Sequence, residues 1–230
     1  MRRALPQRCE LCAARTDGAL VCAECAADLP RVVGACTMCG LPSAGGTICG
    51  ACLHDPPPFE ATVAALVYAF PVDRLVQRIK YGGSIALAHW AGTELAATVC
   101  AKLERNDPGN RPQRIVALPL SAARQRERGF NQAGIIAARV AAATALPVAL
   151  PLERIAGGVP QAELPWAARR ANVRGAFTVR GVVRGARVAL VDDVMTTGAT
   201  LREASLALKR AGAARVECWV VARTLSPDRD

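Results

Sequence analysis

The sequence has few aromatic residues and no long apolar run. Aromatic residues make up 4% of the 230 residues, so single-stranded nucleic acid would find few rings on which to stack its bases. No apolar run reaches the ~18 residues that a membrane span requires. The basic residues 1–6 are not followed by the apolar stretch of ~7–15 residues that is typical of a signal peptide. We therefore expect a cytoplasmic protein with no membrane span.

Acidic residues are also scarce, and charge and cysteine are distributed unevenly. The chain has 29 Lys and Arg against 19 Asp and Glu, a net charge of +10. Residues 1–60 contain 5 basic and 6 acidic residues, whereas residues 61–230 contain 24 basic and 13 acidic residues. Eight of the ten cysteines lie within the first 52 residues, before the break at Pro56–Pro58. We expect a small N-terminal domain over residues 1–55, which is too short to be stable by apolar burial alone, and a larger domain over residues 60–230.

The eight N-terminal cysteines form four Cys-x-x-Cys pairs. Each pair directs two thiolates to one centre, and two pairs complete a tetrahedral zinc site. The spacing from Cys12 to Cys22 repeats from Cys39 to Cys49, which indicates an internal duplication of two similar modules. The sequence predicts two structural zinc ions, one held by the first four of these cysteines and one by the last four: Cys9, Cys12, Cys22, Cys25, Cys36, Cys39, Cys49 and Cys52.

Other interpretations of this cysteine pattern remain open at the level of sequence. A disulfide framework suits a secreted protein, whereas a reducing cytosol would keep the thiols free. A redox Cys-x-x-Cys motif usually occurs once, beside a βαβ pattern, and an iron–sulfur cluster takes the same ligands. A cross-braced pairing of the four motifs is an alternative to the sequential one. His54, two residues after Cys52, is either a surface residue or an additional ligand.

After the prolines, short apolar runs alternate with longer Ala-rich segments. This alternation predicts an α/β domain with a mostly parallel sheet that helices cover on both faces. The predicted strands are 62–70, 114–120, 148–150, 187–191 and 215–223, and the predicted helices are 73–79, 85–105, 131–143 and 199–211. The wholly apolar run 188–191 is typical of a central strand.

Two carboxylates and a Thr- and Gly-rich segment follow this central strand. Asp192 and Asp193 stand where vicinal ribose hydroxyls could donate hydrogen bonds to them, and the following helix offers free N–H groups to a phosphate. Gly198 allows the backbone to approach a ligand closely. The alternative is an Asp pair that forms a turn and caps the helix. The segment as a whole favours a phosphoribose site, because the Asp pair and the hydroxyls of Thr196, Thr197 and Thr200 stand together between a buried strand and a helix.

Residues 188–200 resemble the 5-phosphoribosyl-1-diphosphate (PRPP) motif of type I phosphoribosyltransferases at every position. With the four Cys-x-x-Cys pairs and the segment Ala117–Gln132, which includes Arg128-Gly129-Phe130-Asn131-Gln132, the chain resembles the ComF/GntX family. The resemblance covers residues 9–225. It implies a double zinc ribbon joined to a domain with the type I phosphoribosyltransferase fold, with PRPP as ligand and magnesium as cofactor.

The resemblance also implies roles for individual residues. Asp192 and Asp193 would hold the ribose hydroxyls, and Arg124 and Arg128 would bind the diphosphate, with Lys80 as a further cation. The residues implied for the 5′-phosphate are Thr196, Thr197, Gly198, Ala199 and Thr200. Residues 154–177 resemble the mobile catalytic loop of these enzymes, although Gly158-Val159-Pro160-Gln161 contains no lysine. Arg154 or Arg169 would then supply the charge, and the residues implied for catalysis are Asp192, Asp193, Arg128 and Arg169.

Two functions from different classes fit these features. Transfer of a phosphoribosyl group from PRPP needs no protein nucleophile, only positioning, Mg²⁺ and cations around the leaving diphosphate. The alternative that the resemblance implies is a non-catalytic factor of DNA uptake and competence, which binds single-stranded DNA and works with the uptake machinery. Residues 121–187 contain 11 Arg and 3 acidic residues, and this charge suits PRPP and a nucleic acid backbone equally.

Overall fold

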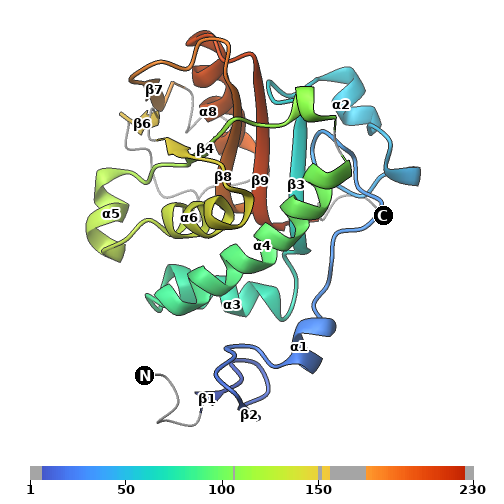
Figure 1. The fold of residues 1–230 in the computed structure, drawn as a ribbon, viewed down its shortest axis with the longest axis vertical. Coiled ribbons are helices and arrows are strands. Elements are labelled where there is room, and N and C mark those ends of the chain that lie inside the picture. The colour runs from blue at the N-terminus through green and yellow to red at the C-terminus, as the bar shows by residue number, and fades with distance from the viewer. Residues whose placement is uncertain (1–6, 106, 150–151, 156–174, 226–230) are drawn as a thin grey trace.

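The centre of the protein is a five-stranded parallel sheet (Figure 1). A computed structural model describes residues 7–105, 107–149, 152–155 and 175–225. The strand order is β3-β9-β8-β4-β5, and each neighbouring pair is parallel. The strands are β3 (Ala61–Val67), β4 (Arg114–Ala117), β5 (Val148–Ala149), β8 (Arg187–Met195) and β9 (Arg215–Arg223). The predicted α/β architecture is confirmed.

Helices cover both faces of this sheet. Helices α4 and α6 pack against each other in front of the sheet in Figure 1, and α8 packs on β8 and β9 from the other side. The helices are α3 (Val72–Lys80), α4 (Ile85–Arg105), α5 (Ala122–Arg128), α6 (Gln132–Thr144), α8 (Ala199–Arg210) and the short 3₁₀ helix η2 (Pro108–Asn110). Strands β6 (Leu152–Arg154) and β7 (Phe177–Val179) form a separate antiparallel pair. None of the described helices combines the length and the hydropathy needed to cross a membrane.

The N-terminal segment forms two small modules that dock at different places. The first contains β1 (Gln7–Arg8), β2 (Arg15–Thr16) and α1 (Ala23–Ala27), and it lies near α3 and α4 at the bottom of Figure 1. The second contains the 3₁₀ helix η1 (Ala44–Gly46) and α2 (Gly50–His54), and it lies beside β3 at the upper right. The two repeats of the sequence are therefore separate bodies on the surface of the sheet domain.

The segment between these modules, together with the start of the second module, covers the free edge of β3. The N–H of Val67 donates to Pro30 O (2.8 Å), and the N–H of Thr62 donates to Thr37 O (2.9 Å). Arg31 forms an antiparallel bridge with Leu66. An open strand edge invites pairing with other chains, so this segment occupies backbone groups of β3 that would otherwise be available to such pairing.

Most element boundaries agree with the predictions, and the exceptions have local causes. Helix 85–105 and strand 215–223 have the predicted bounds. Strands β3 and β4 each end three residues early, at Val67 and Ala117. Strand β8 was predicted to end at residue 191, but it continues to Met195, because Asp192, Val194 and Met195 still pair with β9. Helix α5 was not predicted; the Ser121 hydroxyl accepts from the Arg124 N–H at its start.

One carboxylate is fully buried at the start of β9. Glu217 has 0% exposure, and its oxygens accept from Lys102 Nζ (2.9 Å), Arg215 Nε (3.1 Å) and Trp219 Nε1 (3.3 Å). Buried charges are tolerated when they are paired and hydrogen-bonded. This network therefore ties α4 to β9 and orients Trp219, the largest fully buried side chain.

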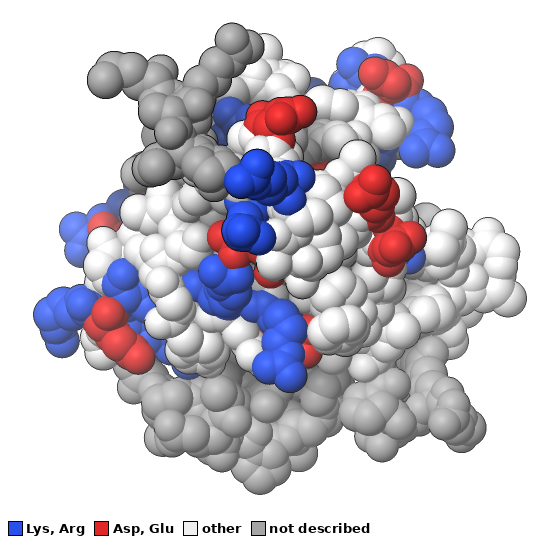
Figure 2. Space-filling view, turned by 90° about the horizontal axis from the view of Figure 1, so that it is seen from below, with Lys and Arg blue, Asp and Glu red and all other residues white. Residues whose placement is uncertain are grey.

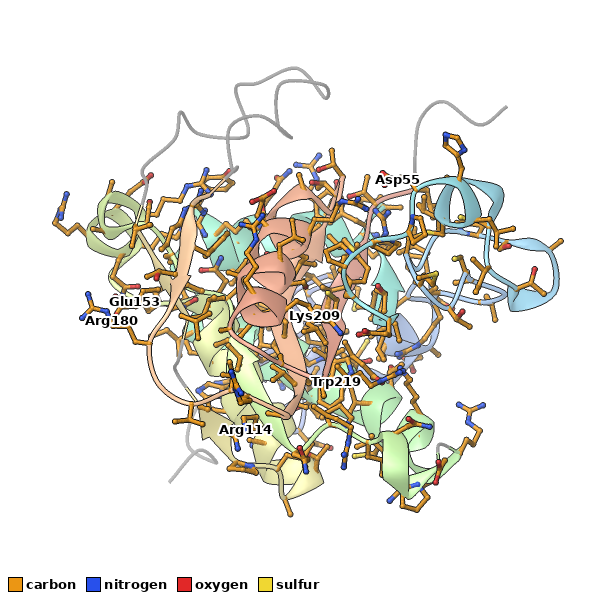
Figure 3. The ribbon with its side chains drawn as sticks, turned by 90° about the horizontal axis from the view of Figure 1, so that it is seen from above. Asp55, Arg114, Glu153, Arg180, Lys209 and Trp219 are labelled. Carbon is orange, nitrogen blue, oxygen red and sulfur yellow. The ribbon has the colours of Figure 1, made fainter. Side chains whose placement is uncertain are left out.

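Replacing Glu217 by alanine is expected to lower the free energy of unfolding by about 3 kcal/mol, because Lys102 and Trp219 would lose a buried acceptor. Urea unfolding followed by circular dichroism measures this loss. The matched control is Glu153→Ala, which removes the exposed Glu153–Arg180 ion pair (2.8 Å). Figure 3 labels this pair at the edge of the molecule. Exposed pairs contribute little, so this change should stay below about 0.5 kcal/mol. Equal losses in the two variants would contradict the prediction.

Candidate functional site

A cavity of about 360 Å³ opens at the carboxyl ends of β3, β4 and β8. In parallel sheets ligands bind at this end of the strands. Figure 2 views the molecule from this side, and Lys and Arg side chains with acidic side chains beside them are visible near the centre of that view. The lining residues are Tyr68, Gln77, Lys80, Tyr81, Leu118, Pro119, Leu120, Arg124, Arg128, Gln132, Arg154 and residues 192–201. Of the residues predicted for the PRPP site, all that lie within the described ranges line this one cavity.

The two aspartates at the end of β8 have different surroundings. Asp193 is buried, and its Oδ1 lies 3.2 Å from Lys80 Nζ, while its Oδ2 accepts from Gln132 Nε2 (3.2 Å). Asp192 is half-buried and faces the cavity; its Oδ1 accepts from the Asp193 N–H (2.8 Å). Both carboxylates therefore line the cavity, and Asp193 is in addition held by neighbouring side chains.

The electrostatics of this pair follow from burial and proximity. Loss of solvent, reinforced by the neighbouring Asp193 carboxylate, raises the pKa of Asp192 to about 8, and Lys80 only partly opposes this. Burial by itself would lower the pKa of Lys80, but attraction to Asp193 and Asp192 outweighs it, so the net shift is upward. Asp192 therefore keeps its proton to a higher pH than an ordinary aspartate, beside the Lys80–Asp193 ion pair.

Residues 196–200, which follow β8 and are called the phosphate segment below, have a geometry that suits a phosphate group. Gly198 has φ +77°, in the left-handed region, and a Cβ on it would stand 2.8 Å from Met195 Cε, so only glycine fits here without strain. Helix α8 begins at the next residue, and the Ala199 N–H donates to Thr197 Oγ1 (3.1 Å). The helix N-terminus and the lining residues 196–200 thus face the cavity together.

Cations from three separate elements border the same cavity. Lys80 ends α3, Arg124 and Arg128 come from α5, and Arg154 ends β6. Burial lowers the pKa of Arg154, and the nearby charge of Arg124 adds to this effect. The Arg128 guanidinium also lies 5.9 Å from the centre of the Tyr81 ring. The cavity therefore combines a helix N-terminus with several cations, an arrangement that can hold anionic groups.

Part of the predicted site lies outside the described residues. Arg169 and most of the predicted loop over residues 154–177 belong to this part of the chain, and only residues 154, 155 and 175–177 are described. Arg154 lies at the cavity, where it can supply the charge expected of a loop cation.

Sequence reasoning did not assign two polar residues that the structure places at or behind the cavity. Gln132 is buried against Asp193, and its Oε1 has no hydrogen-bond partner among the described residues. Its place in the Asn131-Gln132 signature at the start of α6 was the only signal in the sequence. Arg223, at the end of β9, donates to the main-chain oxygens of Met195 and Thr196 behind the phosphate segment. Nothing in the sequence distinguishes Arg223 from the other arginines.

The eight N-terminal cysteines form two clusters of four. Cys9, Cys12, Cys22 and Cys25 form the first, and within each cluster the sulfurs lie within 4.8 Å of one another. The second cluster contains Cys36, Cys39, Cys49 and Cys52. The sequential pairing is therefore confirmed over the cross-braced one. All ten cysteines of the chain are free of disulfides, and the exposed His54 belongs to neither cluster.

The geometry of both clusters fits a zinc ion. Four thiolates about 2.3 Å from a central zinc ion stand roughly 3.8 Å apart in a tetrahedron. The Cys12–Cys22 and Cys39–Cys49 sulfur distances are both 3.7 Å. Burial acts to raise the pKa of Cys9, but backbone N–H groups that donate to its sulfur lower it to about 6. The pKa of the equivalent Cys36 is lowered to about 7 in the same way. The chain thus has two zinc-binding sites, each built from four cysteines.

Comparison with known proteins finds two domain families in this chain. Residues 1–53 match the double zinc ribbon domain, and residues 127–229 match the phosphoribosyl transferase domain. A solved structure of glutamine PRPP amidotransferase from B. subtilis overlaps 60% of this chain and 26% of that chain, with 25% identity and a TM-score of 0.39.

Similarity to curated proteins extends over most of the chain. The DNA utilization protein YhgH of Salmonella typhimurium is 33% identical over 172 residues, which cover 74% of this chain and 75% of that protein. Competence protein F of Haemophilus influenzae is 31% identical over 163 residues, 68% of this chain and 69% of that protein. Together with the two domain matches, these relatives show that the chain belongs to the ComF family, as a phosphoribosyltransferase-like protein with an N-terminal double zinc ribbon.

Proposed function

We propose that the cavity binds PRPP. The observation that carries this proposal is the meeting of a carboxylate pair, a glycine-containing helix N-terminus and several cations in one cavity. Asp192 and Asp193 accept hydrogen bonds from the ribose hydroxyls, and residues 196–200 hold the 5′-phosphate. Lys80, Arg124, Arg128 and Arg154 face the diphosphate, whose charge matches theirs.

The residues present also fit a magnesium ion that arrives with PRPP. Mg²⁺ prefers oxygen ligands and binds through one or two carboxylates together with substrate phosphates. Asp192 lines the cavity, and a cation beside it would offset the loss of solvent and the repulsion from Asp193 that raise its pKa. We propose that Asp192 holds the ion when PRPP is bound. The ion then supplies positive charge that stabilises the leaving diphosphate.

We further propose that the protein transfers the phosphoribosyl group to an acceptor. In such a transfer the bond from the anomeric carbon to diphosphate breaks and a bond to the acceptor forms, without a protein nucleophile. Arg128 and Arg154 stabilise the departing charge because they already border the cavity. Both zinc sites have four thiolates and no open position, so their role is structural. Free thiolate sites of this kind are stable in a reducing cytoplasm, where we place the protein.

The names of the relatives and the charge of α5 favour a second candidate, the binding of single-stranded DNA. Arg126 is exposed on α5 between Arg124 and Arg128 at the cavity, and such a cationic surface attracts a phosphate backbone. Anisotropy of a labelled oligonucleotide should show affinity that falls steeply with rising salt. Competition by PRPP would place both ligands in the same cavity. No binding, or binding that is independent of salt, would contradict this candidate.

The proposed function predicts that the protein binds PRPP in solution. Calorimetric titration of the protein with PRPP and Mg²⁺ should show one site per chain. Asp192→Asn should weaken this binding at least about tenfold, because an amide cannot ionise to hold the magnesium ion and accepts a hydrogen bond from the ribose hydroxyl less well than a carboxylate does. The matched control is Asp17→Asn, which makes the same charge change at an exposed position in the first zinc module and should leave the affinity unchanged. Absence of binding to the unmodified protein would refute the proposed function.

The second prediction concerns pH and stability. The pKa of Asp192 is higher in the folded protein than its ordinary value of 3.8. Its contribution to stability is therefore fully present below about pH 4 and is lost as the pH rises toward about 8. Asn mimics the protonated acid, so the stability advantage of Asp192→Asn over the unmodified protein should grow by about 1 kcal/mol per pH unit between pH 5.5 and 7.5. Urea unfolding at several pH values measures it, and a constant difference would show that Asp192 ionises normally.

A further inference from the structure

The side chain of Arg223 joins the second zinc module to the backbone of the phosphate segment. Arg223 is the last residue of β9 and has 3% exposure. Its Nε donates to Cys39 O (2.8 Å), and its Nη1 donates to Met195 O (2.9 Å) and to Thr196 O. One buried guanidinium thus bonds the main chain of a zinc ligand on one side and the main chain that enters the phosphate segment on the other.

An ion pair also connects the same two parts of the protein. Arg202 lies in the first turns of α8, and its Nη2 is 3.0 Å from Asp55 Oδ1. Asp55 directly follows α2, which carries the zinc ligand Cys52, and Figure 3 shows it between α2 and the body of the protein. The second zinc module therefore contacts both the start of the phosphate segment and the helix that follows it.

The zinc knuckle of residues 36–40 is held against β3 by hydrogen bonds and close packing, so its position relative to Arg223 is fixed. Thr62 donates from its N–H to Thr37 O (2.9 Å) and from its hydroxyl to Met38 O (2.5 Å). Gly40 has φ +70°, and a Cβ there would stand 3.1 Å from Thr62 Cγ2 and 3.7 Å from Arg223 Cδ. A side chain at this position would be strained and crowded, so the glycine permits this close approach.

The first zinc module docks on a different part of the protein and provides an internal comparison. Its Glu10 pairs with Arg78 of α3, and Arg31, which follows it, pairs with Glu94 of α4 (2.8 Å). The two modules are equivalent in their clusters, since Cys22 N–H donates to Cys9 Sγ and Cys49 N–H donates to Cys36 Sγ at 3.3 Å in both. They differ in what they contact.

We propose that the second zinc site positions the phosphate segment through Arg223, and that the first site does not. Metal binding fixes the knuckle and hence the carbonyl of Cys39. If the knuckle opens, the buried guanidinium loses an acceptor, which is costly for a charged group. The carbonyls of Met195 and Thr196 then lose their fixed partner, and the following N–H groups lose their common direction toward the phosphate. Arg223 is thus a positioning residue, and its consequence for PRPP affinity rests on the proposed function.

The first test compares equivalent ligand losses in the full chain. Cys39→Ser and its matched control Cys12→Ser should each reduce the zinc content from two ions to one, measured by elemental analysis. Hydrogen exchange is then followed, without PRPP, at two amides that bracket the segment: Thr224, which donates to Met195 O (3.1 Å), and Arg202, which donates to Gly198 O (2.8 Å). Exchange should accelerate at least about tenfold in Cys39→Ser and less than about twofold in Cys12→Ser.

The second test keeps both metals and removes only the connection. In Arg223→Lys a single ammonium cannot span the acceptors that the guanidinium bonds. This variant should retain two zinc ions, accelerate exchange at the same two amides, and weaken PRPP binding about tenfold. The control Arg210→Lys makes the same change at an exposed position at the end of α8 and should alter neither. If Arg223→Lys does not fold, stepwise zinc removal from the unmodified protein by a chelator replaces it, with exchange followed at each step.

The outcomes separate this inference from the proposed function. Exchange is measured without ligand, so protection that depends on the second site supports the positioning role even if PRPP does not bind. Equal acceleration in Cys39→Ser and Cys12→Ser, or unchanged exchange after loss of the second metal, overturns it even if PRPP binds. Loss of PRPP affinity in Arg223→Lys with unchanged exchange at both amides also overturns it, because the effect would then not pass through the backbone of the segment.

Discussion

The end of strand β8 is the constraint on which the cavity depends, because two carboxylates and a phosphate cradle must follow one another within nine residues. Residues 188–191 are fully buried, so the strand cannot move to relieve the repulsion between Asp192 and Asp193. Pairing with β9 continues through Met195 and holds the carboxylates in place. The repulsion is reduced locally, since Lys80 pairs with Asp193 and the raised pKa of Asp192 favours its protonated form. Under the proposed function, a ligand that brings hydroxyl donors and a cation would offset what remains of this repulsion.

The two zinc modules take the place of a hydrophobic core in the N-terminal segment, but they do not form a separate domain that is detached from the sheet. Cys9, Val21 and Leu29 belong to the same apolar cluster as the sheet domain. The segment between the modules covers the edge of β3, so one stretch of chain both connects the metal sites and closes the sheet. Each module is thereby held against a different part of the fold, one beside α3 and α4 and the other behind the phosphate segment.

Most of the fold and much of the candidate site were predictable because their signals are local. The wholly apolar run 188–191 predicted a central strand, and helix 85–105 was correct at both ends. Element ends were less predictable: β8 continues past the apolar run because hydrogen bonds to β9, rather than side-chain polarity, keep Asp192 and Val194 extended. The apolar pattern gave no sign of α5, a short polar helix held by the Ser121 cap and ended by Gly129.

The sequence by itself determined the chemistry of this protein: eight thiolates in repeated pairs, and a carboxylate pair before a Thr- and Gly-rich segment. These features are set by spacing along the chain, since each group of ligands lies within about twenty residues. Only the tertiary structure decided which distant residues meet them. Asp193 contacts Lys80, which is 113 positions earlier in the chain, and Gln132, which is 61 positions earlier. Arg223 links Cys39, 184 positions earlier, to the phosphate segment. Such contacts depend on strand order and helix packing, which place parallel strand ends side by side whatever their separation in sequence.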